Sequence, residues 1–345
     1  MRVLTIRMRD DTHDRLKRLH GIIHSSRFCL LLACALLAGL AHAQQNYPSR
    51  PVRIMVGFAP GGPNDIIARA YGARLAESLG QPFVVENRTG AGGNLAAEVV
   101  ARAAPDGHTL MLGSTGTNAV NPSLYRELPF DLVRDLAIVT LVATSPSALA
   151  VHPRVPAQNV RELIALARAR PGKLTYASAG SGSSQHLAAE LFKQMAGVDI
   201  VHVPYKGAAP GIADLVAGQV DMSFAPVANV VPLARAGKLR LLALTGAKHS
   251  AFAPGTPTIA ESGLPGFDVT TWYAVFATAG TPEDIIDRLY AELARIAQLP
   301  QVREPLASIG VDTQTSASPA QARAHRASEV EKWGKLARAI GVKVE

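Results

Sequence analysis

Short apolar-rich runs alternate with longer amphipathic stretches along most of the chain. Residues 52–58 (VRIMVGF) and 109–113 (TLMLG) are runs of this kind and predict buried strands. The stretch after the first run places Ile67, Tyr71 and Leu75 four positions apart, which predicts a helix with one apolar face. Strands that alternate with helices are typical of an α/β fold with a largely parallel sheet.

The same pattern extends over the rest of the chain. Further strands are predicted at 83–86, 148–152, 174–177, 200–203, 221–224 and 239–245, and helices at 95–103, 160–170 and 185–196. The end is helical. Thr281 is expected to cap a helix with Pro282 at its first position, and Ser318-Pro319 is expected to open a last helix.

Four of the predicted strand-to-helix turns are rich in glycine or hydroxyl residues. They read FAPGGPND (58–65), TGAGGN (89–94), GSTGT (113–117) and SAGSGSS (178–184). In open α/β sheets ligands bind beyond the carboxyl ends of strands, where helix N-termini offer free backbone N–H groups. Each loop alone is also compatible with an ordinary capped turn, with Asp65 as a cap or first-turn acid. Together the four loops predict a pocket for a small anion held by backbone amides and hydroxyls.

The N-terminus has the order of a secretory signal peptide. A basic stretch ends at Arg27, an uncharged apolar run covers residues 28–40, and Ala41-His42-Ala43 is a small-x-small cleavage pattern. The apolar run is too short to span a bilayer, which needs roughly 20 residues. We expect cleavage after Ala43 and a periplasmic protein. The alternative is a lipoprotein signal that ends at Cys34.

Removal of this leader changes the net charge and the cysteine content of the protein. The 345 residues carry a formal net charge of +8, but seven Lys/Arg and three Asp/Glu lie in residues 1–43, which leaves +4. Both cysteines, Cys29 and Cys34, also leave, so disulfides, thiolate metal sites and a cysteine nucleophile are excluded from the mature chain. The remaining Lys and Arg are scattered, which disfavours nucleic-acid binding.

Motifs of catalysis are largely missing. The sequence has no G-x-S-x-G, no G-x-x-x-x-G-K-[ST] and no H-E-x-x-H, and its histidines show no metal-ligand spacing. We therefore expect no cofactor, no metal and no catalytic residue. Ser183 and His186 form the single local nucleophile and base candidate, so an exported α/β hydrolase remains the remote alternative. His186 otherwise reads as a surface or pocket residue in a first helical turn.

Seven blocks in order resemble the Bug-type solute-binding receptors of tripartite tricarboxylate transporters. The resemblance covers about residues 47–344. It rests on FAPGGPND (58–65), VVENRTGAGGN (84–94), APDGHTLMLGSTGTNAVNPSLY (104–125), PGKLTYASAGSGSSQHLAAELF (171–192), VHVPYKGAAP (201–210), AGKLRLLALT (236–245) and PTIAESGLPGFDVTTWY (257–273).

The resemblance implies a type II periplasmic binding protein fold, with two Rossmann-like lobes joined by a hinge and a ligand cleft between them. Residues 44–149 plus 273–345 would form lobe 1 and residues 150–272 lobe 2, with crossings near 148–152 and 270–276. The protein, expected as a monomer, would capture a small organic carboxylate and deliver it to integral-membrane transporter subunits. The alternative is a sensor component that signals to a membrane histidine kinase.

The resemblance also implies the residues that line the cleft. Those of lobe 1 are Phe58, Gly61, Gly62, Asp65, Gly90, Gly92, Gly93, Asn94, Ser114, Thr115 and Thr117. Those of lobe 2 are Ser178, Gly180, Ser181, Ser183, His186, Tyr205, Gly207 and Ala225. At Ala225 many relatives carry an acid that in some of them meets a ligand amine. We therefore predict that amino-acid ligands are disfavoured relative to plain carboxylates.

Overall fold

The computed structural model describes residues 47–125, 128–180, 183–205 and 207–340. The predicted leader, with Cys29 and Cys34, and the predicted site residue Ser181 lie outside the described residues. The described residues from Arg50 onward form a compact unit, and all elements below belong to it. None of its described helices combines the length and apolarity that crossing a membrane requires.

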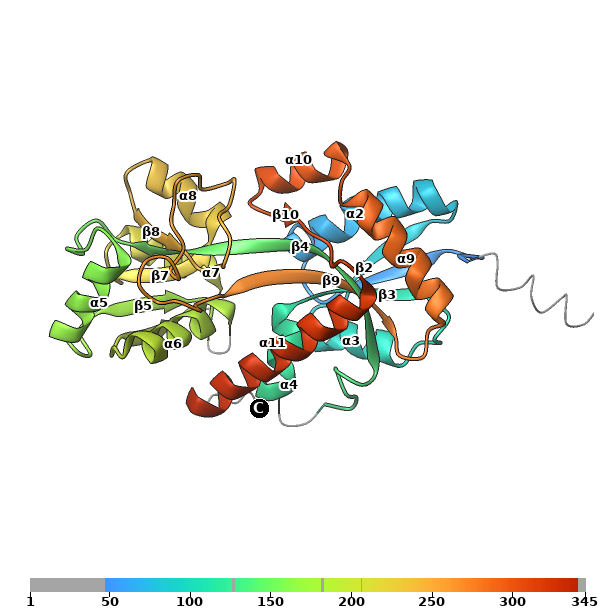
Figure 1. Cartoon of the computed structure of the whole chain (residues 1–345), viewed down its shortest axis with the longest axis horizontal. Coiled ribbons are helices and arrows are strands. Elements are labelled where there is room, and N and C mark those ends of the chain that lie inside the picture. Colours follow the sequence, from blue (N-terminus) through green and yellow to red (C-terminus); the bar gives the residue numbers. More distant parts are fainter. Residues whose placement is uncertain (1–46, 126–127, 181–182, 206, 341–345) are drawn as a thin grey trace, which may run out of the picture. The chain divides into compact units, whose positions relative to one another are not determined.

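In the described part of the chain, ten strands form one continuous sheet, and one long strand pairs with neighbours at both ends of it (Figure 1). At one end, the parallel strands are β1 (Val52–Val56), β2 (Phe83–Asn87) and β3 (Thr109–Ser114), and β3 is followed by the antiparallel β9 (Thr270–Thr278). At the other end, β5 (Thr175–Ser178), β6 (Val201–Pro204) and β7 (Met222–Pro226) are parallel.

The strand that joins the two ends is β4 (Leu136–Val151), which is 16 residues long. Its residues up to Pro146 pair with β9, and from Ser147 onward it pairs with β7 and with β8 (Arg240–Leu244). The short β10 (Asp312–Thr313) pairs with β4 at Thr144. We use lobe 1 for residues 50–146 and 270–340, and lobe 2 for residues 147–269.

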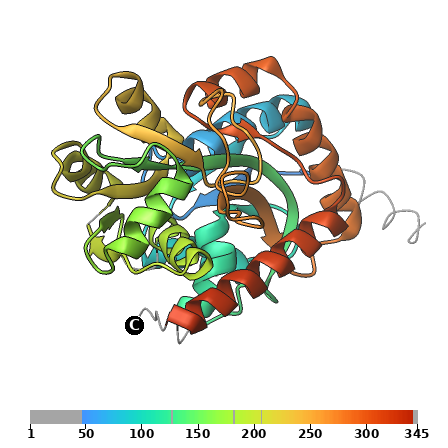
Figure 2. The ribbon, with the colours of Figure 1, turned by 60° about the vertical axis from the view of Figure 1, so that its left-hand side comes forward.

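Helices cover both faces of the sheet in lobe 1 (Figure 1). One group is α2 (Pro63–Leu79), α9 (Glu283–Ile296) and α10 (Pro300–Ser308), and the other is α3 (Asn94–Ala101), the π-helical turn η2 (Gly116–Val120), α4 (Asn121–Leu124) and α11 (Pro319–Ile340). A 3₁₀ turn, η1 (Ala91–Gly93), precedes α3. The long α11 also packs against α6 of lobe 2, as the turned view in Figure 2 shows.

Lobe 2 carries four helices around its strands. They are α5 (Val160–Ala169), α6 (Ser184–Ala196), α7 (Ala208–Val216) and α8 (Val227–Arg235). Side chains of β4 alternate between two apolar clusters, because successive residues of a strand point to opposite faces. Leu149 and Val151 join the cluster that contains Phe192 and Phe224, whereas Ala148 and Ala150 join a second cluster.

Two local predictions from the sequence are wrong. The strand expected only over residues 148–152 is the last part of the much longer β4, which continues through Pro146. Thr281 does not cap the next helix. Its hydroxyl donates to the Thr278 carbonyl, and Pro282 holds the N-cap position of α9.

Candidate functional site

The carboxyl ends of the parallel strands from both lobes lead to the place where β4 changes partners. In lobe 1, β3 ends at Ser114, opposite Tyr273 of β9. In lobe 2, β7 ends at Pro226, opposite Ser147 of β4. Since Pro146 itself pairs with Thr270, both strand ends lie within a few residues of this crossing. The predicted loops therefore start beside the connection between the lobes.

Three predicted loops of lobe 1 are tied to one another. The Thr117 hydroxyl donates to the Gly92 carbonyl at 2.8 Å, and the Asn121 amide donates to the same carbonyl at 3.1 Å. A Cβ at Gly93 would collide with the Thr117 hydroxyl and touch the ring of Phe58. Phe58 is 36% exposed, so its large apolar side chain is open to a ligand.

Asp65 holds the first loop rather than presenting a free carboxylate. Its oxygens accept the Gly61 N–H at 3.0 Å, the Asn87 amide at 3.0 Å and the Arg69 guanidinium at 2.9 Å. Arg69 is the main reason why the pKa of Asp65 falls to about 2. Asn87 also donates to the Phe58 carbonyl, so one buried acid and one amide fix the start of α2.

Thr115 and Asn94 are also engaged, but the amides nearby are not all satisfied. Thr115 Oγ1 accepts the Trp272 N–H at 2.8 Å, and Asn94 Oδ1 accepts the Asn121 amide at 2.8 Å. Within the described part of the chain, Asn94 Nδ2 and both polar atoms of the Asn118 amide are buried without a partner. Buried amides are normally hydrogen-bonded, so these atoms mark a place for water or ligand. Asn118 was not singled out from the sequence.

In lobe 2, two predicted loops run side by side. The Tyr205 N–H donates to the Ser178 carbonyl at 3.1 Å, and the Gly207 N–H donates to the Ala179 carbonyl at 3.2 Å. The Ser183 N–H donates to the Gly180 carbonyl at 3.1 Å. The Tyr205 hydroxyl is directed to Asp214 at 2.7 Å, and burial together with this bond raises the pKa of Tyr205 to about 12.

A stack of rings supports the loop that begins at Ser178. His202 Nε2 lies 2.6 Å from Ser178 Oγ, and the Gly180 N–H donates to the same oxygen at 3.1 Å. The His202 ring stacks on His186 with a centroid distance of 4.2 Å and on Tyr176 at 4.8 Å. The pKa of His202 is lowered to about 4, mainly by burial and also by the adjacent His186. His202 was missed from the sequence because a lone histidine in a strand carries no motif.

Ser183 and His186 are not arranged as a nucleophile and base. The Ser183 hydroxyl caps α6 by accepting the His186 backbone N–H at 3.3 Å, while the His186 ring lies in the stack with His202. His186 is only 5% exposed, so of the two alternatives expected for it, a surface or a pocket residue, the surface one is wrong. Ala225 is fully buried in the apolar cluster with Ala148 and presents no side chain to a cleft in this structure.

Three helices start at predicted glycines with no side-chain cap. Gly62 precedes α2, Gly93 precedes α3 and Gly207 precedes α7, and at none of these N-caps does a side chain accept a backbone N–H. The first N–H groups of a helix have no intrahelical partner and attract anions. By contrast, α5 and α6 are capped by Asn159 and Ser183. Ser114, the third-loop residue at the end of β3, is buried, and Gly90 of the second loop has a positive φ.

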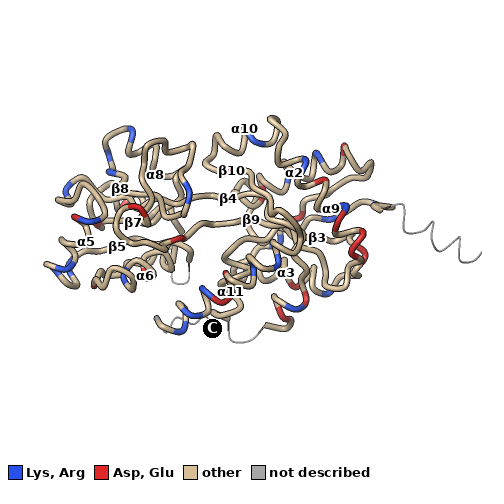
Figure 3. The backbone as a smooth tube through the Cα atoms, in the orientation of Figure 1, with Lys and Arg blue, Asp and Glu red and all other residues tan. Residues whose placement is uncertain are grey.

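Among the described residues, no group of three or more His, Cys, Asp or Glu side chains is placed to hold a metal ion. Lys and Arg are spread over both lobes instead of forming one basic face (Figure 3). The arrangement at the strand ends can bind and orient a small anion through backbone N–H groups, hydroxyls and amides.

Comparison with known proteins gives the family. The model of the tripartite tricarboxylate transporter family receptor matches residues 67–342. Protein BugT of Bordetella pertussis (strain Tohama I) is 37% identical over 89% of this chain and 95% of its own length. The structure of R. palustris Rpa4515 with adipate is 38% identical with a TM-score of 0.73, covering 86% of this chain and 99% of that one. MatC from Rhodopseudomonas palustris with bound malate is 35% identical with a TM-score of 0.69, covering 84% and 99%. The α/β fold is thus that of periplasmic solute-binding proteins, and the chain belongs to the receptors of the tripartite tricarboxylate transporter family.

Proposed function

We propose that the protein captures a small organic carboxylate between lobe 1 and lobe 2 and delivers it to the membrane subunits of a tripartite tricarboxylate transporter. The observation that carries this proposal is the set of uncapped helix N-termini at Gly62, Gly93 and Gly207, which come from both lobes. A carboxylate between them would accept hydrogen bonds from N–H groups that have no side-chain cap in the described part of the chain. Two relatives with the same fold were solved with adipate and with malate.

The glycine and hydroxyl residues of the predicted set would form the polar wall of this site, and the exposed ring of Phe58 would pack on the methylene groups of the ligand. Asp65, the acid in that set, is already held by Gly61, Asn87 and Arg69. Ala225 offers no oxygen from its side chain. An ammonium group on the ligand would therefore find no partner here, which supports a preference for plain carboxylates.

The test is a thermal-unfolding screen of the purified mature chain with four compounds. Adipate and malate should raise Tm, since a ligand at about 100 times its Kd stabilises by about 2.7 kcal/mol. Adipamide, the neutral analogue of adipate, should have no effect, and 2-aminoadipate should compete with adipate at least about tenfold less well. Stabilisation by adipamide with no response to any acid in a wider organic-acid panel would refute an anion site.

We further propose export to the periplasm with removal of residues 1–43. The order of basic stretch, apolar run and Ala41-His42-Ala43 supports it. The mass of the protein recovered from the periplasm of an expressing cell tests this proposal. A chain beginning at Gln44 is expected, whereas a lipid-modified chain beginning at Cys34 would show the lipoprotein alternative to be correct.

A further inference from the structure

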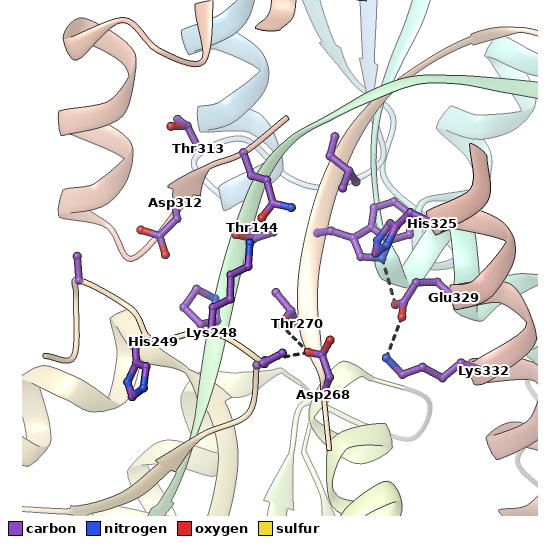
Figure 4. Close-up of a pocket in the computed structure, with 17 residues that line it drawn as sticks. Thr144, Lys248, His249, Asp268, Thr270, Asp312, Thr313, His325, Glu329 and Lys332 are labelled. Carbon is purple, nitrogen blue, oxygen red and sulfur yellow. Dashed lines mark hydrogen bonds and ion pairs between the residues drawn. The ribbon is translucent and has the colours of Figure 1, made fainter. Parts of the chain in front are cut away.

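A cavity lies on β4 and β9, the strands that join the lobes (Figure 4). Its volume is about 490 Å³, and none of the predicted carboxylate-binding residues lines it. Thr144 of β4 and Trp272 of β9, which are paired in the sheet, form its floor. One wall is the segment 246–251 of lobe 2, and the other contains β10 and α11 of lobe 1. We call it the hinge cavity.

Most charged groups around the hinge cavity are already satisfied. Glu329 accepts the indole N–H groups of Trp272 at 3.2 Å and Trp333 at 2.9 Å, and it pairs with Lys332 at 2.8 Å. Asp268 accepts the Thr270 hydroxyl at 3.0 Å and a backbone N–H at 3.2 Å. These bonds fix the walls, so the cavity is lined by groups held in place and is not a gap between free side chains.

Two opposite charges remain without a partner. The side chains of Asp312 on β10 and Lys248 on the lobe 2 wall make no hydrogen bond or ion pair with any described residue, and they do not pair with each other. Figure 4 shows Asp312 and the extended side chain of Lys248 at the same side of the cavity. Asp312 is partly buried, and burial raises the pKa of its carboxyl group. A partly buried carboxylate without a partner lowers stability until a cation or donor reaches it.

The remaining lining is partly apolar, and it also contains the polar side chains of Thr144, Thr313, Gln314, His249 and His325. Leu141, Pro146 and the indole of Trp272 face the cavity between the charged positions. A volume of this size lies within the range of small-molecule sites, which combine apolar walls with a few polar groups that set orientation.

We propose that the hinge cavity is a second binding site, for a small zwitterion whose ammonium group pairs with Asp312, whose carboxylate pairs with Lys248, and whose apolar body lies on Leu141, Pro146 and Trp272. This preference is the reverse of the one proposed for the carboxylate site, where an ammonium group has no partner. The two sites therefore differ in the class of ligand that each accepts.

The test uses isothermal titration of the mature chain with three compounds that share one six-carbon chain. 6-Aminohexanoate carries both charges, hexanoate lacks the ammonium group, and hexylamine lacks the carboxylate. 6-Aminohexanoate is expected to bind at least about tenfold more tightly than either analogue, since each loses one charge-assisted contact. Equal binding of hexanoate with the carboxylate site saturated by adipate, or no binding of 6-aminohexanoate at millimolar concentration, would overturn the proposal.

Variants locate the site. Asp312→Asn and Lys248→Gln should each weaken 6-aminohexanoate binding about tenfold, and Lys335→Gln, an exposed change on the same helix as Lys332, should leave it unchanged. Lys248 is exposed, so its replacement should not disturb folding. Gly93→Ala, which alters the carboxylate site, should not change 6-aminohexanoate affinity, so failure of the two proposals can be told apart. Unchanged binding in both the Asp312 and Lys248 variants would show that the zwitterion binds elsewhere.

Discussion

The hydroxyl groups and rings of the predicted loops fall into two classes, those that can contact a ligand and those that already form bonds within the protein. Thr115 and Thr117 both come from a loop that the sequence marks as a ligand loop, yet their hydroxyls bond to backbone groups of other segments. Which hydroxyl remains free depends on contacts over 25 and 157 positions of chain, which no local motif encodes. The positive φ of Gly61 was predictable because it depends on local backbone conformation, whereas Gly62 has φ of −79°.

His202 gives a first prediction at this scale. Replacing it with Leu removes the group 2.6 Å from Ser178 Oγ and leaves the start of the 178–184 loop unanchored. We expect adipate Kd to rise about tenfold, equivalent to about 1.4 kcal/mol. His202→Gln, which keeps a polar group near Ser178, should raise the adipate Kd by a smaller factor. Isothermal titration would check this, with His152→Gln as a matched control outside the loop, and equal affinity in wild type and His202→Leu would contradict it.

Asp65 gives a pH-dependent prediction. Its pKa is lowered to about 2 in the folded state, so the carboxylate contributes stability that is present above its unfolded pKa and is lost as pH falls through the folded value. Asp65→Asn should reduce the free energy of unfolding by about 2 kcal/mol at pH 7. The difference should shrink steadily from about pH 4 towards pH 2. Urea unfolding at several pH values measures it.

The control for this prediction is Asp287→Asn, an exposed acid on α9 with no ion pair among the described residues. This substitution should lower the free energy of unfolding by less than about 0.5 kcal/mol at every pH. A loss at Asp65 that stays constant down to pH 2 would show that the carboxylate charge is not the source of the stabilisation.

At the scale of elements, the alternation of strands and helices was predictable, and the course of β4 was not. The sequence Ser145-Pro146-Ser147 reads as a break, because a proline cannot donate to a ladder and is rare inside a central strand. In the structure Pro146 lies where β4 leaves β9 and joins β7 and β8. The proline thus marks a change of partner within one strand, which only the tertiary pairing reveals.

The start of α3 offers an element-scale prediction. Gly93 has φ of 94°, and a Cβ there would meet the Thr117 hydroxyl. Gly93→Ala should therefore lower the free energy of unfolding by about 1 kcal/mol through backbone strain and by about 1–3 kcal/mol through the collision. It should also weaken adipate binding. Gly80→Ala is the control, since φ is 73° and nothing lies within 4 Å, so strain alone acts. Equal losses of unfolding free energy in the two variants would exclude the collision as a cause.

For the whole molecule, the proposed mechanism requires the lobes to approach one another on the ligand. The two sequence cysteines lie in the predicted leader, so introduced cysteines would be the only thiols of the mature chain. Dyes at Gln301→Cys in lobe 1 and Arg170→Cys in lobe 2 should show a shorter distance when adipate binds. Both positions are exposed.

Energy transfer between the dyes provides the measurement. A pair within lobe 1, Glu77→Cys with Arg102→Cys, should show no change, because both positions belong to the same sheet and its helices. Binding of adipate without any change in the cross-lobe pair would contradict closure while leaving the binding site itself intact.

The pairing of Pro146 with Thr270 has a consequence for synthesis and export. Lobe 2 is a continuous insertion that leaves β4 and returns to β9 at neighbouring positions of one ladder, whereas lobe 1 is assembled from segments on both sides of it. A chain that emerges from its N-terminus cannot complete the sheet of lobe 1 until β9 has appeared. Lobe 2 has all of its own sequence by then, so it is the part that can fold first, and closure of the lobe 1 sheet is the late, long-range step.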